Sequence, residues 1–315
     1  MKVRKDLLDL ESLDREEIRE ILNRAAPFKE LFARSVKKVP RLQGKTVLLL
    51  FYEPSTRTST SFEVAAKRMD ADVINLPVAQ SSVTKGESVL DTVETLQAMR
   101  VDYIVVRHQR SGVPGLIAKN TAASVINAGD GFHAHPTQGL LDALTLSEVW
   151  GGDFGKRKVL IVGDILHSRV ARSTSTVLRK LGVEIGVLGP GTLIPAGGPP
   201  DFKVFRTWDE ALDWNPEAVY LLRVQLERQK VQFFPSLGEY HRNFGLTLER
   251  LKTLEDRGTW VLHPGPINRG VELADEVTQY ERCLINTQVE NGIATRMAVL
   301  YSLRPGGSPD DDEQS

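Results

Sequence analysis

The hydrophobic positions of this chain form short continuous runs separated by segments in which apolar residues recur at helical spacing. Each run is short and apolar on every position, as expected of a strand that is buried on both faces. In the first half of the chain these runs lie at 47–51, 72–76, 103–107 and 124–128. The helical spacing between them predicts helices over 58–69, 86–99 and 137–149. This alternation is typical of a parallel sheet with helices on its faces.

A second series of the same kind follows the polar, glycine-rich segment 151–156. We place a domain boundary near this segment, because boundaries fall in such stretches. The second series predicts strands at 159–162, 183–188, 218–222 and 260–262, a helix at 170–181 and a loop at 189–200. The expected fold class is therefore α/β, with two domains that are each a mostly parallel sheet flanked by helices.

Both ends of the chain carry recognisable signals. Asp14 followed by Glu17 resembles a capping box that opens a helix, which Pro27 is expected to kink or break. A last helix is expected over about 289–303, with one apolar face made of Val289, Ile293, Met297 and Leu300. The tail 304–315 contains three consecutive aspartates and cannot bury a core, so we expect it to be disordered.

Composition narrows the class of protein. The 315 residues are 41% hydrophobic and 26% charged, with a net charge of −1, which is typical of a globular protein with room for two domains. A near-zero charge without a long basic stripe argues against a nucleic-acid partner. The chain has no apolar run long enough to span a membrane and no apolar secretory stretch near Met1, so we expect a cytoplasmic protein with no membrane partner.

The turn between the first predicted strand and its helix concentrates hydroxyl groups around one arginine. A helix N-terminus at this place offers free backbone N–H groups and a positive dipole end, which favour a bound phosphate. Arg57 adds a planar, permanently charged fork for phosphate oxygens. The simpler interpretation is a helix cap beside a solvated arginine. A cap needs one hydroxyl, however, and this turn offers Ser55, Thr56, Thr58, Ser59 and Thr60.

Several other predicted strands end in cationic or hydrogen-bonding side chains. Ligands of parallel sheets collect at the carboxyl ends of strands, so these groups are expected to share a cleft that holds anions. The segments that follow the strands are Arg107-His108, 133–138, 163–169, Arg223-Val224-Gln225 and His263-Pro264-Gly265-Pro266.

Each of these residues also has a simpler interpretation. Arg107 could pair with a surface carboxylate, His135 could be an ordinary helix-start histidine, and Arg169 and Arg223 could be solvated. We assign a structural or surface role to four histidines, His108, His133, His167 and His241. We expect Cys283 to be an inert thiol in the core. All of these strand ends and the phosphate turn carry groups that can bind anions. Their occurrence together favours a shared anion-binding cleft over a separate structural explanation for each residue.

The polar loop 81–87 ends in Lys-Gly-Glu and precedes a predicted helix. A loop that carries Lys85 could act as a lid over an anionic substrate. A solvent-exposed connector is the alternative, and the loop alone does not decide between them.

A dinucleotide site is the natural rival, because the second series begins with a strand, a glycine and a helix. The segment 162–167 lacks the second and third glycines of that fingerprint, and Asp164 puts a negative charge where a pyrophosphate would lie. There is no Walker lysine motif and no metal-binding pair of histidines, and the single cysteine excludes both a disulfide framework and a cysteine-based zinc site. We therefore expect neither a cofactor nor a metal.

At this point the motifs resemble a known family. The segment 53–58 resembles the carbamoyl-phosphate signature of the aspartate/ornithine carbamoyltransferases. The resemblance continues in family order from about residue 47 to 300, through Lys85-Gly86-Glu87, Arg107-His108, 135–138, Arg169, 223–228 and 263–266.

Three details resemble the aspartate branch rather than the ornithine branch. The signature opens with Glu53, where ornithine enzymes commonly carry lysine. The segment 263–266 reads His-Pro-Gly-Pro rather than His-Cys-Leu-Pro, and 223–228 has the pattern Arg-x-Gln-x-Glu-Arg. Gly265 departs from the best-known branch, where leucine often stands. Two arginines, Arg169 and Arg223, also suit the two carboxylates of L-aspartate.

The resemblance implies a role for each candidate residue. The phosphate of carbamoyl phosphate would be held by Ser55, Thr56, Arg57 and Thr58. Donors to the carbamoyl oxygen would be Thr58, Arg107 and His135, with the carbamoyl amino group held by Gln138 and the carbonyls of Pro264 and Gly265. L-aspartate would be bound by Lys85, Arg169, Arg223 and Gln225. A neighbouring subunit would supply Ser81 and Lys85.

The resemblance also implies the organisation of the protein. A carbamoyl-phosphate-binding domain would comprise 1–150 plus 287–303, with the last helix returning to the first domain, and an aspartate-binding domain would comprise 151–286. The assembly would be a homotrimer with shared active sites, which could join a regulatory chain or a dihydroorotase.

Two other functions stay open at this stage. The chain could carbamoylate another amine or amino acid, and the pair Arg223 and Gln225 is the feature that bears on this choice. It could also be a non-catalytic homologue that acts as a scaffold, although none of the expected catalytic residues is missing.

Overall fold

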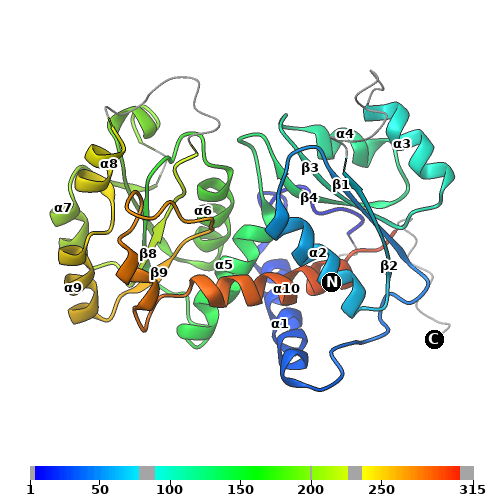
Figure 1. Ribbon diagram of the computed structural model, residues 1–315, viewed down its shortest axis with the longest axis horizontal. Helices are drawn as coiled ribbons and strands as arrows, with labels where there is room; N and C mark the ends of the chain where they lie inside the picture. The colour runs from blue at the N-terminus through cyan, green and yellow to red at the C-terminus, as the bar shows by residue number, and fades with distance from the viewer. Residues whose placement is uncertain (1–3, 78–88, 199–200, 226–235, 306–315) are drawn as a thin grey trace. The chain divides into compact units, whose positions relative to one another are not determined.

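The structure is a computed structural model that describes residues 4–77, 89–198, 201–225 and 236–305 (Figure 1). The chain divides into two compact units, one made of 1–144 with 290–315 and the other of 145–289. Each unit contains one parallel sheet flanked by helices, which confirms the predicted fold class.

The first unit contains a sheet of four parallel strands in the order β2-β1-β3-β4. The strands are β1 (Thr46–Phe51), β2 (Asp72–Pro77), β3 (Tyr103–His108) and β4 (Ser124–Asp130). All four correspond to the apolar runs of the sequence. The register pairs Phe51 with Arg107 and His108 with Asp130, so the carboxyl ends of β1, β3 and β4 lie side by side.

The helices of this part of the chain are α1 (Arg15–Glu30), η1 (Leu31–Ala33), α2 (Thr56–Arg68), α3 (Val89–Ala98), α4 (Val113–Lys119) and α5 (Pro136–Val149). The predicted capping box is present: the Asp14 carboxylate accepts the N–H of Glu17 at 2.8 Å, and the Glu17 carboxylate accepts the N–H of Asp14 at 2.8 Å. Helix α1 runs through Pro27 to Glu30, so the expected break was wrong. The seven-residue α4 was not predicted.

The second unit contains a sheet of five parallel strands in the order β7-β6-β5-β8-β9. Its strands are β5 (Lys158–Val162), β6 (Glu184–Leu188), β7 (Lys203–Phe205), β8 (Ala218–Leu221) and β9 (Trp260–Leu262). Four of them were predicted, whereas β7 was missed. That strand lies at the sheet edge and has three residues, none of them buried, so it lacks the apolar run that marks the others.

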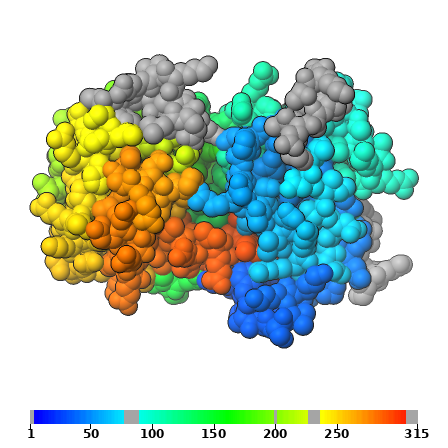
Figure 2. Space-filling view, in the orientation of Figure 1, coloured from blue at the N-terminus to red at the C-terminus, as the bar shows by residue number. Residues whose placement is uncertain are grey.

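The helices of the second unit are α6 (Arg169–Leu181), η4 (Gly191–Leu193), α7 (Trp208–Asp213), α8 (Leu237–Phe244), α9 (Leu248–Arg257) and η6 (Asp275–Gln279). Its core packs strand residues such as Leu160 and Val219 against Trp208 and the α9 leucines Leu251 and Leu254. Figure 2 shows α8 and α9 in yellow beside the orange segment that contains η6, on one face of this unit.

The last helix, α10 (Ile285–Ser302), carries the chain back to the first unit. Arg24 of α1 donates to the Ser302 hydroxyl at 3.3 Å, and the rings of Phe28 and Tyr301 meet edge to face at 6.0 Å. The predicted return of the C-terminal helix is therefore confirmed. The expected apolar face was wrong at Val289, which is 56% exposed. The acidic residues 306–315 lie outside the described part of the chain.

Candidate active site

The predicted phosphate turn lies between the end of β1 and the start of α2. Ser55 is the N-cap residue of α2, with φ −159° and ψ 82°, and its hydroxyl makes no capping hydrogen bond. Thr56 and Arg57 are exposed in the first turn of the helix, whereas Thr58 is buried. The turn therefore offers an uncommitted cap hydroxyl and an exposed guanidinium at the positive end of a 13-residue helix.

Arg107 lies beside this turn because β3 is the neighbour of β1. Its carbonyl accepts the N–H of Tyr52 at 2.9 Å. Its guanidinium donates to a carboxylate oxygen of Glu53 at 2.9 Å, and the two side chains are only 12% and 13% exposed. The carboxylate partner of Arg107 thus belongs to the candidate site itself and is not on the open surface.

The loop that leads to His135 is organised by the buried carboxylate of Asp130. That carboxylate accepts the backbone N–H of Gly112 at 2.7 Å and of Ala134 at 3.1 Å, and it contacts Nδ1 of His133 at 3.1 Å. His135 is buried at the start of α5, and its carbonyl accepts the N–H of Gln138 at 3.0 Å. The sequence singled out the two histidines but missed Asp130, whose only signal was its place in a glycine-rich turn.

A buried polar group beneath these residues joins three helices of the first unit. The side-chain amide of Gln138 donates to the carboxylate of Asp142 on α5 at 3.0 Å. Arg296 of α10 is 4% exposed, donates to the Ser61 hydroxyl at 3.0 Å and lies over the Phe62 ring of α2. Burial lowers the pKa of the Arg296 guanidinium to about 10, an effect that the Asp142 carboxylate opposes and the Arg107 charge strengthens.

We expect the substitution Asp142→Asn to lower the free energy of unfolding by about 1–3 kcal/mol, because Arg296 would stay buried without the negative charge that offsets its desolvation. Urea denaturation measures this change. The matched control is Asp72→Asn, an exposed position in β2, which should shift stability by less than about 0.5 kcal/mol. An equally small shift for Asp142→Asn would contradict the role given to this carboxylate.

Arg169 is the first residue of α6 in the second unit. It is 3% exposed, so the alternative of a solvated arginine does not hold for it. The hydroxyl of Ser168 caps the helix by accepting the N–H of Ala171 at 3.1 Å. Asp164, which opens the preceding loop, accepts the N–H of His167 at 2.9 Å and contacts its Nδ1 at 3.1 Å. The loop is therefore tied down just before the arginine.

Arg223 and Gln225 follow the end of β8. Both are partly exposed, whereas Val224 between them is buried and fixes the backbone of this segment. Gly265 follows β9 in the same sheet, and its N–H donates to Nδ1 of His263 at 2.8 Å. The φ of Gly265 is +58°, a left-handed conformation that glycine adopts without the penalty that leucine would carry.

The buried carboxylate of Glu272 connects these two segments. It accepts the N–H of Val224 at 2.7 Å, and it accepts both the backbone N–H and the side-chain amide of Asn268 at 2.7 Å. Its other neighbour is Nε2 of His263, at 3.7 Å. A single side chain, 1% exposed, therefore positions the strand end that carries Arg223 and the loop that carries Gly265. Sequence reasoning missed Glu272, because nothing in the local pattern distinguishes it from a surface glutamate.

Ser81 and Lys85 lie outside the described residues, as do residues 226–228 of the Arg-x-Gln-x-Glu-Arg pattern. Within the ranges that the structure describes, no group of three or more His, Cys, Asp or Glu side chains could hold a metal ion. In the same ranges, no helix combines the length and the apolar composition that crossing a bilayer requires.

Cys283 is half-buried after β9, and burial raises the pKa of its thiol. The raised pKa keeps the thiol protonated near neutral pH, so we expect iodoacetamide to modify native Cys283 more slowly than the same residue in urea-unfolded chain. The native rate should rise only as the pH climbs toward the raised pKa. Mass spectrometry at a series of pH values measures both rates, and equal rates in the two states would contradict this expectation.

Within the described residues, these features define a class: an α/β protein built from two parallel-sheet units, with arginine, histidine or glutamine side chains after the carboxyl ends of several strands. Models of one family match nearly the whole chain. "Aspartate/ornithine carbamoyltransferase, carbamoyl-P binding domain" matches residues 5–148, and "Aspartate/ornithine carbamoyltransferase, Asp/Orn binding domain" matches residues 155–303. The chain belongs to the aspartate/ornithine carbamoyltransferase family.

Individual relatives agree with this assignment. The chain is 60% identical over 302 residues to the aspartate carbamoyltransferase catalytic subunit of Akkermansia muciniphila, covering 96% of this chain and 97% of the relative. The structure of aspartate transcarbamoylase from Trypanosoma cruzi in complex with carbamoyl phosphate and aspartate matches with a TM-score of 0.85 at 26% identity, over 96% and 97% of the two chains. Ornithine carbamoyltransferase from Thermus thermophilus matches with a TM-score of 0.81 at 28% identity, over 96% and 100%.

Proposed function

We propose that this chain transfers the carbamoyl group of carbamoyl phosphate to the amino group of L-aspartate, giving N-carbamoyl-L-aspartate and phosphate, a step of pyrimidine biosynthesis. The observation that carries this proposal is the turn before α2, with an uncommitted Ser55 hydroxyl, an exposed Arg57 and Arg107 beside it. The high identity to a relative named as an aspartate carbamoyltransferase catalytic subunit supports aspartate as the acceptor.

Carbamoyl phosphate would bind mainly to the first unit. The phosphate would lie against the N-terminus of α2, held by Ser55, Thr56, Arg57 and Thr58. Donors from Thr58, Arg107 and His135 would stabilise the negative charge that develops on the carbamoyl oxygen. The amino group of the carbamoyl moiety would be held by the side chain of Gln138 and by the backbone carbonyls of Pro264 and Gly265. The described contacts support these roles, because Glu53 holds Arg107 and the buried Asp142 holds the side chain of Gln138.

L-aspartate would bind through its two carboxylates. Arg169 would take the α-carboxylate, and Arg223 with Gln225 would take the β-carboxylate. An arginine at 223 would repel the cationic side chain of ornithine, which supports the aspartate acceptor over the ornithine one. Lys85 and Ser81 would complete the site from a neighbouring subunit.

The reaction needs no covalent enzyme intermediate. The neutral amine of aspartate attacks the carbamoyl carbon and forms a C–N bond, giving a tetrahedral intermediate. This intermediate collapses with cleavage of the C–O bond to phosphate, and the leaving phosphate takes the proton that the amine loses. The protein contributes positioning and electrostatic stabilisation, and pairing two reactants in this way can lower a barrier by about 7–11 kcal/mol.

The test is direct. The purified chain, incubated with carbamoyl phosphate and L-aspartate, should form N-carbamoyl-L-aspartate and release one phosphate for each product molecule. A panel that includes L-ornithine and other amino acids should show aspartate as the best acceptor. Preference for a different acceptor would replace aspartate in the proposal, and no turnover with any acceptor would favour a non-catalytic homologue.

The organisation expected from the family resemblance is part of the proposal. We propose a carbamoyl-phosphate-binding domain of 1–150 plus 287–303, an aspartate-binding domain of 151–286, and a homotrimer with shared active sites. Association with a regulatory chain or a dihydroorotase is proposed from the resemblance, and a cytoplasmic location is proposed from the composition of the chain. Light scattering during turnover tests the trimer, because a fully active monomer is incompatible with a site completed by Ser81 and Lys85 of a neighbour.

A further inference from the structure

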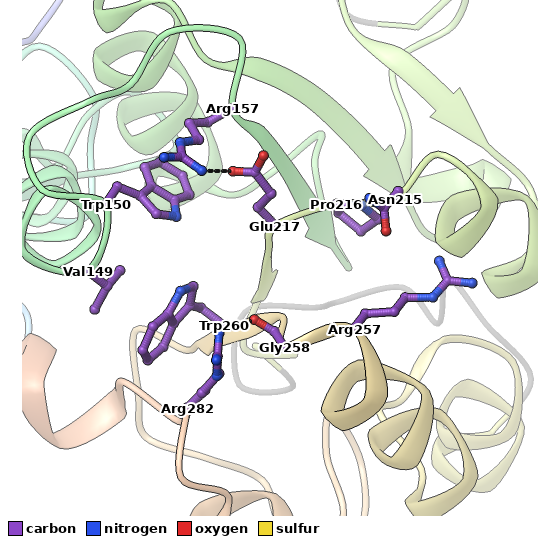
Figure 3. Close-up of a pocket in the computed structure, with 10 residues that line it drawn as sticks. All are labelled: Val149, Trp150, Arg157, Asn215, Pro216, Glu217, Arg257, Gly258, Trp260 and Arg282. Atoms are coloured by element: carbon purple, nitrogen blue, oxygen red, sulfur yellow. Dashed lines mark hydrogen bonds and ion pairs between the residues drawn. The ribbon is translucent and has the colours of Figure 1, made fainter.

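A cavity of about 320 Å³ opens in the second unit (Figure 3). It lies at the amino ends of the strands, whereas the candidate site residues of this unit follow the carboxyl ends. Arg157 precedes β5, Glu217 precedes β8 and Trp260 begins β9, so the cavity lies where these parallel strands start. Arg223 and His263 instead follow the carboxyl ends of β8 and β9. None of the residues assigned to substrates lines this cavity.

Two tryptophans present hydrogen-bond donors to the cavity. The indole nitrogens of Trp150 and Trp260 point into the space between the two rings (Figure 3). An indole N–H donates and cannot accept, and no other residue in the described ranges accepts a hydrogen bond from either of them. The space between the rings therefore suits a ligand that carries acceptor atoms.

The charges that line the cavity are mostly positive. Arg157 contacts the carboxylate of Glu217 at 2.9 Å, so the charges of these two side chains neutralise each other. Arg282 donates to the carbonyl of Gly258 at 2.6 Å, and Arg257 donates to the carbonyl of Leu212. With three arginines and one glutamate in the lining, two positive charges are left without a carboxylate among the lining residues. Each guanidinium has five N–H donors, so donors are left for a ligand.

Each tryptophan is also held in place by a cation. The guanidinium of Arg157 lies 5.7 Å from the ring centre of Trp150, and that of Arg282 lies 4.9 Å from the ring centre of Trp260. Such cation–π contacts hold the indoles in position, and the contact with Trp260 keeps the charge of Arg282, which has no carboxylate partner among the lining residues, beside an aromatic wall. A ligand with a flat ring next to an anionic group would meet both features at once.

We propose that this cavity binds a small aromatic oxyanion, either a carboxylate or a phosphate monoester. Its oxygens accept hydrogen bonds from the indole N–H groups and from Arg282, and its ring packs beside the tryptophan rings. The cavity has the size of a small-molecule site and is too small for a macromolecule. The assignment does not depend on the proposed function, because the two sites share no residue.

Isothermal titration of the full chain with benzoate, with phenyl phosphate and with inorganic phosphate tests the proposal. The titrations are made with the catalytic site saturated by N-(phosphonacetyl)-L-aspartate, so that a probe binding there is not counted. We expect one additional site per chain and quenching of indole fluorescence. Binding of benzoate alone identifies a carboxylate ligand, and binding of phenyl phosphate alone identifies a phosphate ester.

Substitutions in the lining give the decisive comparison. The variant R282Q should weaken the probe at least about tenfold, since Arg282 supplies a charge-assisted hydrogen bond. The exposed α8 position Arg242 provides the matched control, R242Q, which should bind as the unmodified chain does. Trp260→Phe keeps a ring and removes the N–H donor, so it should weaken binding by a smaller factor than R282Q. Thermal melting verifies that each variant is folded.

Three results overturn the proposal. One is the absence of any additional binding of either probe at millimolar concentration. Another is an unchanged affinity in the folded R282Q variant. The third is an equal affinity for inorganic phosphate, because the aromatic walls would then contribute nothing.

Discussion

Replacing Arg57 with alanine is expected to weaken the binding of carbamoyl phosphate by about 100-fold, because a bidentate pair of charge-assisted hydrogen bonds to phosphate contributes about 3 kcal/mol. Arg57 is exposed in the first turn of α2, so the fold should be unaffected. Titration calorimetry with carbamoyl phosphate measures the affinity, and thermal melting confirms that the variant unfolds cooperatively.

Two further variants sharpen this test. Arg57→Lys keeps the positive charge but loses the planar fork, so it should bind with an intermediate affinity. Arg19→Ala removes an exposed arginine of α1 and should leave binding unchanged. If Arg57→Ala bound carbamoyl phosphate as tightly as Arg19→Ala, the turn before α2 would not be the phosphate site.

Replacing Glu272 with leucine is expected to lower the free energy of unfolding by about 3 kcal/mol or more. The substitution removes the acceptor of three N–H donors, from Val224 and Asn268, and each buried donor left unsatisfied costs about 1–3 kcal/mol. Urea denaturation measures the loss. The exposed Glu276, in η6 of the same unit, provides the control Glu276→Leu, which should change stability by less than about 0.5 kcal/mol.

Glu272→Gln separates positioning from stability and keeps the test meaningful if the leucine variant does not fold. Glutamine has the same shape but only one acceptor oxygen, so it cannot receive both the Val224 and the Asn268 backbone N–H groups. Because Val224 lies between Arg223 and Gln225, we expect the KM for L-aspartate to rise about tenfold, the scale of one lost hydrogen bond to a charged group. The affinity for carbamoyl phosphate should change less, since only its amino group would meet the Gly265 loop, whereas its phosphate would bind the turn between β1 and α2. Equal effects on both substrates would indicate a general loss of structure.

The sequence predicted strands correctly where both faces of the strand are buried. The runs 47–51 and 159–162 became β1 and β5 because every position in them is apolar and both faces of their sheets are covered. The edge strand β7 and the helices α4, α7, α8 and α9 were missed. Strand β7 has three residues and these helices have six to ten, which carry too little periodicity to be distinguished from loop. Val289 was misplaced for a related reason: helix α10 is buried on most sides along its second half, so no single apolar face marks it.

The candidate site likewise contains residues that the sequence identified and residues that it missed. Residues proposed to touch substrates were identified in the sequence because arginines, histidines and hydroxyls at strand ends are chemically conspicuous. Glu272 and Arg296 were not identified, because their partners are far away along the chain: Glu272 meets Val224 across 48 residues, and Arg296 meets Ser61 across 235. Local patterns carry no signal for such pairs.

By itself, the sequence determined the two parallel sheets, most helices of the first unit, helix α6 of the second unit and the kinds of side chain at each strand end, because these follow from hydrophobic period and residue chemistry over a few neighbouring positions. Only the tertiary structure decided that Arg107 pairs with Glu53, that Asp142 offsets a buried Arg296, and that Glu272 joins two loops. A buried charge is stable only beside groups that compensate its desolvation, and those groups become neighbours only when the chain has folded.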